Sequence, residues 1–137
     1  MGARNIENAL ARNPEVVEWC QRASPRMARA RTVGLCTGSF FLAEAGLLNN
    51  RRTTMHWSVA ALMERRYPYV RVEPDSIFVK DGPIWTSADV IACMDLALAM
   101  IEEDLGRDMA LSVARNVCSL SPMPPGKTIP ATFPRDA

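Results

Sequence analysis

Apolar residues occur along this chain in two patterns, as short continuous runs and as segments with the spacing of a helix. Residues 32–36, T-V-G-L-C, form a short run that is typical of a strand buried on both faces of a sheet. Four further strands are expected, at residues 51–55, 70–72, 76–80 and 84–86. The last two flank Asp81-Gly82, a dipeptide that favours the tight turn of a β-hairpin.

Segments with helical spacing alternate with these strands. Five helices are expected, at residues 14–21, 39–45, 57–66, 88–105 and 107–117. The first begins at Asn13-Pro14-Glu15, where a capping side chain, a proline and a carboxylate suit a helix start. It is expected to bury apolar side chains on or near one side, namely Val16, Val17 and Trp19. Gly46 and Gly106 are expected to end two of the other helices.

The order of the elements predicts the architecture. Strands and helices alternate over most of the chain, which indicates an α/β fold with a mainly parallel sheet. At 137 residues the chain fits a single domain. Residues 119–137 are rich in proline and show no sustained periodicity. We therefore expect one α/β domain at residues 1–118, followed by an irregular tail at residues 119–137.

Composition and charge exclude several functions. The formal net charge is +1 and apolar residues make up 48% of the chain, so binding to nucleic acid or to a membrane surface is not indicated. No apolar run approaches the roughly 20 residues that a membrane span needs. Because the amino terminus, M-G-A-R-N-I-E-N-A-L, lacks the apolar core of a signal peptide, we expect a cytoplasmic protein.

The cysteine and histidine content gives no reason to expect a metal or another cofactor, and none is predicted. Cys20, Cys36, Cys93 and Cys118 have no zinc-binding spacing, and His56 is the only histidine. In a reducing compartment the four cysteines are expected to be free thiols. The ordinary role of any one of them is that of a small buried apolar residue.

Cys36 lies between the buried strand and a helix start, a position in which a thiol can act as a nucleophile. At such a sharp turn, the first amides and the dipole of the helix favour a thiolate. The same amides can hold an oxyanion that forms when the sulfur attacks a substrate. Gly38 is expected to let the chain fold tightly behind the cysteine. The alternative is a cysteine that simply ends a core strand.

His56 follows the second expected strand, twenty residues after Cys36. Neighbouring parallel strands bring their carboxyl ends together in an α/β sheet. The imidazole is therefore placed to reach Cys36 as a proton carrier or an orienting group. The alternative is a lone histidine beside Trp57, hydrogen-bonded at the surface.

Four segments of the chain resemble one known family. They are C-T-G-S-F-F-L-A-E-A-G-L-L, R-R-T-T-M-H-W, Y-P-Y-V-R-V-E-P-D-S-I-F-V-K-D-G-P-I-W-T-S-A and D-L-A-L-A-M-I-E-E-D-L-G. With these segments in this order and spacing, the chain from Met1 to Val117 is similar to the PfpI/ThiJ (class I glutamine amidotransferase-like) superfamily. It resembles most the sensor domain of GlxA-like AraC-type transcription regulators. Isocyanide hydratases share the cysteine turn and the T-x-H-W segment.

The resemblance implies a flavodoxin-like three-layer sandwich and roles for individual residues. Cys36 is similar to the family's reactive cysteine and His56 to its partner histidine. Thr37 and Gly38 match the turn whose amides form an anion pocket. Trp57 follows the histidine and is expected to contribute to ligand binding.

The sequence also departs from the family pattern. Residues 86–88 match the segment packed behind the site, but the family usually has glycine where Asp89 and Cys93 stand. Residues 121–127 replace the basic end of the family domain. The first β-α-β-α-β portion, with its acidic residue, is expected to be missing. A start codon assigned too late in the gene, or a truncation of the chain, would explain this. Such an incomplete sheet is expected to make the chain self-associate, bind a partner or be marginally stable.

Two functions follow from the resemblance. The first is a sensor, in which the pocket around Cys36 and His56 binds a small molecule and an attached DNA-binding module responds. No such module is expected in this chain, so direct binding to nucleic acid is not expected either. The second is a cysteine-dependent enzyme, such as an isocyanide hydratase-like enzyme or an amidase-like hydrolase, which needs a third group to set the protonation of the cysteine. The sensor is the preferred interpretation.

Overall fold

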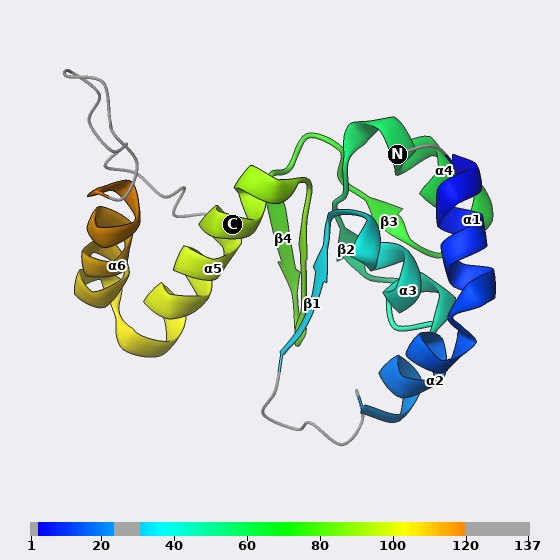
Figure 1. Cartoon of the computed structure of the whole chain (residues 1–137), viewed down its shortest axis with the longest axis horizontal. Coiled ribbons are helices and arrows are strands. Elements are labelled where there is room, and N and C mark those ends of the chain that lie inside the picture. The colour runs from blue at the N-terminus through cyan, green and yellow to red at the C-terminus, as the bar shows by residue number, and fades with distance from the viewer. Residues whose placement is uncertain (1–2, 24–30, 120–137) are drawn as a thin grey trace. The chain divides into compact units, whose positions relative to one another are not determined.

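The computed structural model describes residues 3–23 and 31–119. The chain divides into two compact units, Met1–Cys93 and Met94–Ala137. The strands of the described residues all lie in the first unit, together with the first four α-helices (Figure 1). The expected domain boundary at residue 118 stays a prediction, because the expected tail beyond residue 119 lies outside the described residues.

The strands of the first unit form two sheets. The larger sheet has the order β1-β5-β4, formed by Thr32–Leu35, Ile84–Ser87 and Phe78–Asp81. In this sheet β1 and β5 are parallel, whereas β4 and β5 form the antiparallel hairpin expected around Asp81-Gly82. The smaller sheet joins β2 (Arg52–Thr53) and β3 (Arg71–Val72) in parallel. The five expected strands are therefore present, and the α/β class with a mainly parallel sheet is confirmed.

Six α-helices occur in the described residues. They are α1 (Ala3–Arg12), α2 (Pro14–Ala23), α3 (Ser39–Glu44), α4 (Trp57–Arg66), α5 (Val90–Leu105) and α6 (Arg107–Ser119). The five expected helices are confirmed, and α2 begins at Pro14 as predicted. The Asn13 side chain, however, donates from Nδ2 to the carbonyl oxygen of Ala9 at 2.7 Å, in the last turn of α1. Helix α1 is not among the expected helices, although Ile6 and Leu10 have helical spacing and are 4% and 5% exposed.

The side of α2 that faces the core differs from the expected one. Val16 is 38% exposed and Trp19 is 58% exposed, so the expected burial of these two side chains is wrong. Cys20 is buried instead, and Val17, three residues before it, is half-buried. Residues three apart share one face of a helix, and in α2 only this narrow face meets the core.

The core of the first unit lies between helices α1 to α4 and the strands (Figure 1). Its largest fully buried apolar side chains include Phe40 on α3, Leu48, Met55 and Met63. Burial of one such side chain contributes about 1.5–3 kcal/mol to stability. The core therefore fixes α3 and the segment after β2, and these two parts of the chain carry the candidate site.

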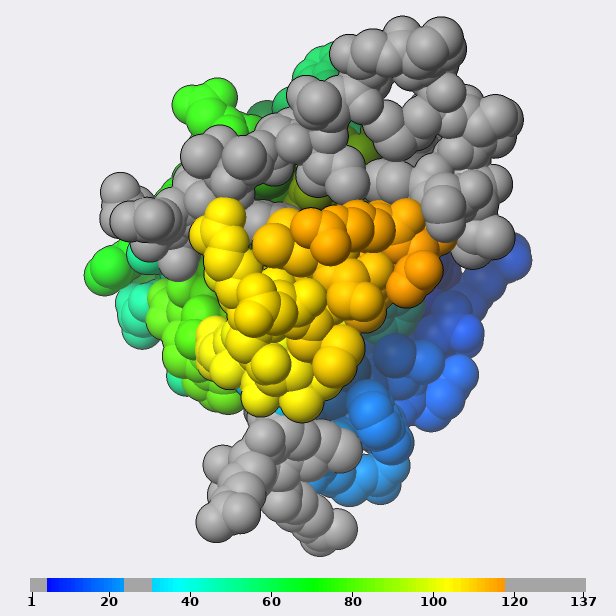
Figure 2. Space-filling view, turned by 90° about the vertical axis from the view of Figure 1, so that its left-hand side faces the viewer, coloured from blue at the N-terminus to red at the C-terminus, as the bar shows by residue number. Residues whose placement is uncertain are grey.

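The second unit contains most of α5 and the whole of α6. Figure 2 shows the residues of these two helices in yellow and orange. The expected helix ends are confirmed, since Gly106 with φ +89° follows α5 and Gly46 with φ +78° lies just beyond α3. On α6, Ala110 and Ala114 lie four residues apart and are both buried. No helix in the described part of the chain has the length and apolar character needed to cross a membrane.

Candidate functional site

Cys36 lies at a strained turn at the end of β1. It is the first residue of a 3₁₀ turn, Cys36–Gly38, which leads directly into α3. Its φ is +52°, in the left-handed region that residues other than glycine rarely adopt. Such a conformation costs a residue with a side chain roughly 1–2 kcal/mol. The prediction of a strained turn between strand and helix is confirmed, and the thiol is half-buried.

The glycine that makes this turn possible is Gly34 rather than Gly38. Gly38 has a helical φ of −60°, and a Cβ added there meets no atom within 4 Å. The expectation that Gly38 permits the tight fold is therefore wrong. A Cβ on Gly34, in contrast, lies 2.8 Å from Ser39 Oγ and 2.9 Å from Leu42 Cδ1. Strand β1 and helix α3 approach each other so closely that only glycine fits between them.

Strand β5 lies beside β1 and ends at the same level. Gly34 pairs with Thr86 and Leu35 with Ser87, so the end of β5 lies next to the cysteine turn. The expectation that residues 86–88 adjoin the site is confirmed by this register. Thr86 and Ser87 are both fully buried, which makes their hydroxyl groups part of the structure behind the turn.

His56 caps the amino terminus of α4. Its Nδ1 accepts a hydrogen bond from the backbone amide of Ser58 at 3.3 Å and lies 2.8 Å from Ser58 Oγ. The imidazole lies against Trp57, with ring centroids 5.4 Å apart, and the Trp57 side chain is 76% exposed. These contacts match the alternative of a histidine hydrogen-bonded at the surface. The role of His56 as the partner of Cys36 stays a prediction, as do the ligand-binding roles of Thr37, Gly38 and Trp57.

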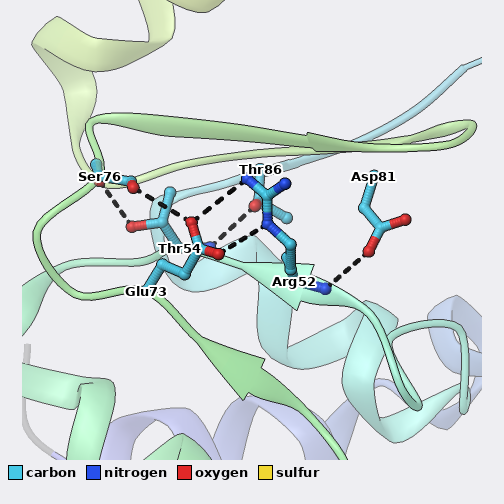
Figure 3. Close-up of polar contacts among 6 residues, drawn as sticks. All are labelled: Arg52, Thr54, Glu73, Ser76, Asp81 and Thr86. Carbon is cyan, nitrogen blue, oxygen red and sulfur yellow. Dashed lines mark hydrogen bonds and ion pairs between the residues drawn. The ribbon is translucent and has the colours of Figure 1, made fainter. Parts of the chain in front are cut away.

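A pair of buried threonines connects the end of β2 to the end of β5. The backbone amide of Thr54 donates to Thr86 Oγ1 at 2.9 Å, and Thr54 Oγ1 donates to the carbonyl oxygen of Ser76 at 2.8 Å (Figure 3). Thr54 lies two residues before His56, and the β1 partner of Thr86 lies two residues before Cys36. Sequence reasoning did not find this connection. The only signal is the polar pair T-T within an expected strand.

Ionic contacts hold β2 at the outer edge of the same region. The amide of Arg52 donates to Asp81 Oδ2 at 2.8 Å, and its Nε lies 2.6 Å from Glu73 Oε1 (Figure 3). The hydrogen bond to Glu73 is the main cause of a raised pKa at Arg52. Arg51 Nη1 lies 3.5 Å from Asp81 Oδ1. Because both guanidinium groups pair with carboxylates, these arginines act as charges at a strand edge rather than as an anion site.

The other described thiols lie in different surroundings. Burial raises the pKa of the Cys20 thiol, in agreement with its expected shielding. Cys93 Sγ lies 3.1 Å from Ser87 Oγ and donates to the carbonyl oxygen of Asp89 at 3.0 Å. Asp89 Oδ1 in turn accepts the amide of Ala92 at 2.8 Å, near the start of α5. The two side chains at the expected glycine positions are therefore held by local hydrogen bonds.

The Cys118 side chain lies outside the described part of the structure. Within the described residues, no group of three histidine, cysteine, aspartate or glutamate side chains is arranged to hold a metal ion. The groups that the sequence predicts for the site are a thiol, an imidazole, an aromatic ring and backbone amides.

The sequence model of the DJ-1/PfpI family matches residues 1–103. The chain belongs to the DJ-1/PfpI family. This result confirms the resemblance inferred from the four sequence segments. It also confirms the flavodoxin-like fold, of which β1, β5 and the cysteine turn form part.

Several curated relatives of this DJ-1/PfpI chain are transcription regulators. The chain is 36% identical over 109 residues to the HTH-type transcriptional regulator CdhR of Pseudomonas aeruginosa. The aligned region covers 80% of this chain and 32% of that protein. The chain is 40% identical over 84 residues to the HTH-type transcriptional regulator GlxA of Rhizobium meliloti, over 61% of this chain and 26% of that protein. The isonitrile hydratase of Pseudomonas putida is 37% identical over 101 residues, or 72% of this chain and 42% of that enzyme.

A solved structure supports the same relationship. An AraC family transcriptional regulator from Pseudomonas putida matches with a TM-score of 0.67 and 27% sequence identity, over 76% of this chain and 55% of that chain. The chain thus spans about half of this solved relative and less than half of the three curated ones. The expected kinship with GlxA-like regulators and with isocyanide hydratases is confirmed.

Proposed function

We propose that this chain is a small-molecule-sensing domain of the DJ-1/PfpI family that serves transcription regulation. The observation that carries the proposal is the strained backbone of Cys36, with φ +52° at the end of a strand. Strain of this kind persists where the surrounding structure enforces it, and it concentrates at ligand-binding and catalytic sites. The curated relatives that match most of the chain include regulators such as CdhR, which favours sensing as the use of this site.

In the proposed site the ligand lies against the cysteine turn. The Cys36 thiol and the backbone of Thr37 and Gly38 contact its polar end, while His56 and Trp57 approach from the end of β2. Trp57 offers a largely exposed aromatic surface for an apolar part of the ligand. A helix-turn-helix module of the kind named in the regulators, supplied by a partner or by a longer protein, would respond to the bound ligand.

The hydrogen bonds of His56 support binding more than proton abstraction. Nδ1 lies 3.3 Å from the amide of Ser58 and 2.8 Å from Ser58 Oγ, and in the neutral tautomer that accepts from this amide the ring proton resides on Nε2. Nε2 is then a donor, suited to orient an anionic ligand or a thiolate. A general base at Nε2 requires the opposite tautomer, which gives up the hydrogen bond from the Ser58 amide.

A second function, a cysteine-dependent enzyme, is favoured by one specific observation. The isonitrile hydratase of Pseudomonas putida is 37% identical over 72% of this chain. In this alternative, Cys36 attacks the substrate and His56 assists proton transfer. The two functions share the same pocket and differ in whether the ligand is turned over.

The first experiment tests whether Cys36 is the reactive thiol. The folded full chain is treated briefly with iodoacetamide near neutral pH, and the modified cysteines are located by peptide mapping. Cys36 is expected to react first, because Cys20 is only 8% exposed and the Cys93 sulfur is hydrogen-bonded. His56→Ala is expected to change the Cys36 rate. Earlier modification of Cys20 or Cys118 would remove the case for a functional turn.

A second experiment separates the sensor from the enzyme. The same preparation is incubated with an isocyanide, an amide and a glyoxal, and product formation is followed. Fast alkylation of Cys36 without turnover of these compounds agrees with sensing. Turnover that disappears in Cys36→Ser would establish the enzyme instead.

A further inference from the structure

Among the residues that the structure describes, no backbone ladder joins the two strands that precede Cys36 and His56. Cys36 follows β1, which pairs with β5, and His56 follows β2, which pairs with β3. Within the described residues these pairings belong to two separate sheets, although β2 contacts β4 and β5. Within the described residues, no strand ladder therefore fixes the end of β2, which precedes His56, relative to the end of β1, which precedes Cys36.

The hydroxyl group of Thr86 provides this connection. Its Oγ1 accepts a hydrogen bond from the backbone amide of Thr54 at 2.9 Å (Figure 3). Both threonine side chains are 0% exposed, so water does not compete for this hydrogen bond. Thr86 itself is fixed in the sheet by its pairing with Gly34 in β1.

We propose that Thr86 is the positioning residue that sets His56 relative to Cys36. This inference rests on the proposed function, since it assigns a role to the same pair. Each reactive residue lies only two positions beyond a residue that Thr86 contacts, Gly34 on one side and Thr54 on the other. Two extended residues span about 7 Å. A displacement at the Thr86 hydrogen bond is thus passed to His56 through a short and direct piece of backbone.

The chain offers matched variants for a test. Thr86→Val keeps the shape of the side chain but removes the acceptor, and the Thr54 amide is then buried without a partner. Thr86→Ser keeps the hydroxyl group and serves as the rescuing variant. Thr53→Val is the control, because Thr53 is also 0% exposed and its hydroxyl has no hydrogen-bond partner among the described residues.

The experiment measures the rate of Cys36 alkylation by iodoacetamide in each variant, with His56 present and with His56→Ala. Thr86→Val is expected to change the rate several-fold, in the same direction as His56→Ala. Thr86→Ser and Thr53→Val are expected to react like the unmodified sequence. In the His56→Ala background, Thr86→Val is expected to have no further effect, because the group that it positions is absent.

The single histidine supplies a second readout that a general loss of stability does not imitate. His56 gives the only imidazole signals in a proton NMR spectrum. Alkylation of Cys36 is expected to shift these signals in the unmodified sequence and in Thr86→Ser, but not in Thr86→Val. If Thr86→Val does not fold, Thr86→Cys replaces it, since sulfur is a weak acceptor and an intermediate effect is expected.

Three results would contradict the Cys36–His56 pair or the positioning role of Thr86, and each can be told from the others. If His56→Ala leaves the Cys36 rate unchanged, the proposed pair is absent and the positioning role falls with it. If His56→Ala acts but Thr86→Val does not, only the positioning role is wrong. If Thr86→Val has the same effect with and without His56, Thr86 acts on Cys36 directly through the sheet, and the inference is again wrong.

Discussion

At the residue scale, the candidate site depends on two unusual backbone conditions. Cys36 adopts a positive φ that few residues with a side chain tolerate. Gly34 stands where β1 and α3 come so close that any Cβ would collide with Ser39 and Leu42. Together these conditions fix Cys36 at the end of β1, next to the end of β5.

Gly34→Ala is expected to destabilise the protein. The added methyl group lies 2.8 Å from Ser39 Oγ, 2.9 Å from Leu42 Cδ1 and 3.1 Å from the Ser39 Cα, so these buried side chains or the start of α3 must shift. Overpacking of this kind costs about 1–3 kcal/mol. Urea unfolding followed by circular dichroism measures the change in the free energy of unfolding.

Gly38→Ala is the matched control for this experiment. Gly38 has a helical φ of −60° and open space at the Cβ position. Alanine there is expected to be neutral or to stabilise by about 0.4–1 kcal/mol, because it restricts the unfolded chain. Equal destabilisation by the two substitutions would contradict the assignment of the close approach to Gly34.

At the scale of elements, hydrogen bonds and ion pairs of side chains join helices and strands that, in the described part of the chain, no backbone hydrogen bonds connect. Helices α1, α3 and α4 meet at a polar cluster that follows the same principle as the threonine pair. Tyr67, just after α4, donates its hydroxyl to Glu44 of α3 and accepts a hydrogen bond from Arg66 Nε at 3.0 Å. Arg66 also lies 3.6 Å from Glu7 of α1.

This cluster predicts a loss of stability in alkali. Burial, and then the hydrogen bond to Glu44, raise the pKa of Tyr67 from 10.0 to about 12. A folded-state pKa above the unfolded value means that the unfolded chain ionises first. The contribution of Tyr67 is therefore fully present below about pH 10 and is lost as the pH rises through about 12.

Thermal melts at a series of alkaline pH values test this prediction. In Tyr67→Phe, stability is expected to fall less steeply in alkali, because the ionisation of Tyr67 no longer contributes to the fall. Tyr69→Phe is the control and is expected to keep the original profile, because the Tyr69 side chain is 69% exposed. A decline that is identical in all three proteins would show that Tyr67 does not contribute to it.

At the scale of the whole molecule, β1 is an edge strand among the described residues. It pairs with β5 on one side, and the sheet order β1-β5-β4 gives it no described partner on the other. Leu35 at its end is 47% exposed. Unpaired strand edges with apolar side chains favour association with another chain.

The full chain is therefore expected to self-associate rather than to behave as a well-defined monomer. Light scattering at increasing protein concentration is expected to show a rising average mass. A constant monomer mass together with a cooperative melt would contradict this prediction. The sample for this measurement is the whole chain of 137 residues.

The sequence by itself determined which segments become strands and helices, and that Cys36 lies at the turn between a strand and a helix. Apolar runs and helical spacing are local properties, so they fixed all five strands, five of the helices and the turn at Cys36 before the fold was known. The position of His56 after an expected strand already singled it out, and the family resemblance added its predicted role as partner of Cys36 and the flavodoxin-like topology. Helix α1 was not predicted because, among its residues whose side chains the structure describes, only Ile6 and Leu10 are buried, which is a weak pattern.

Only the tertiary structure decided which residues meet across the sheet. The exposure of Trp19 and Val16 depends on which face of α2 the core accepts, and no local pattern states that choice. The need for glycine at position 34 arises from the closeness of α3, whereas Gly38 has room for a side chain. The hydrogen bond between Thr54 and Thr86 joins residues 32 positions apart, and such a pairing depends on how distant strands are stacked rather than on their own sequences.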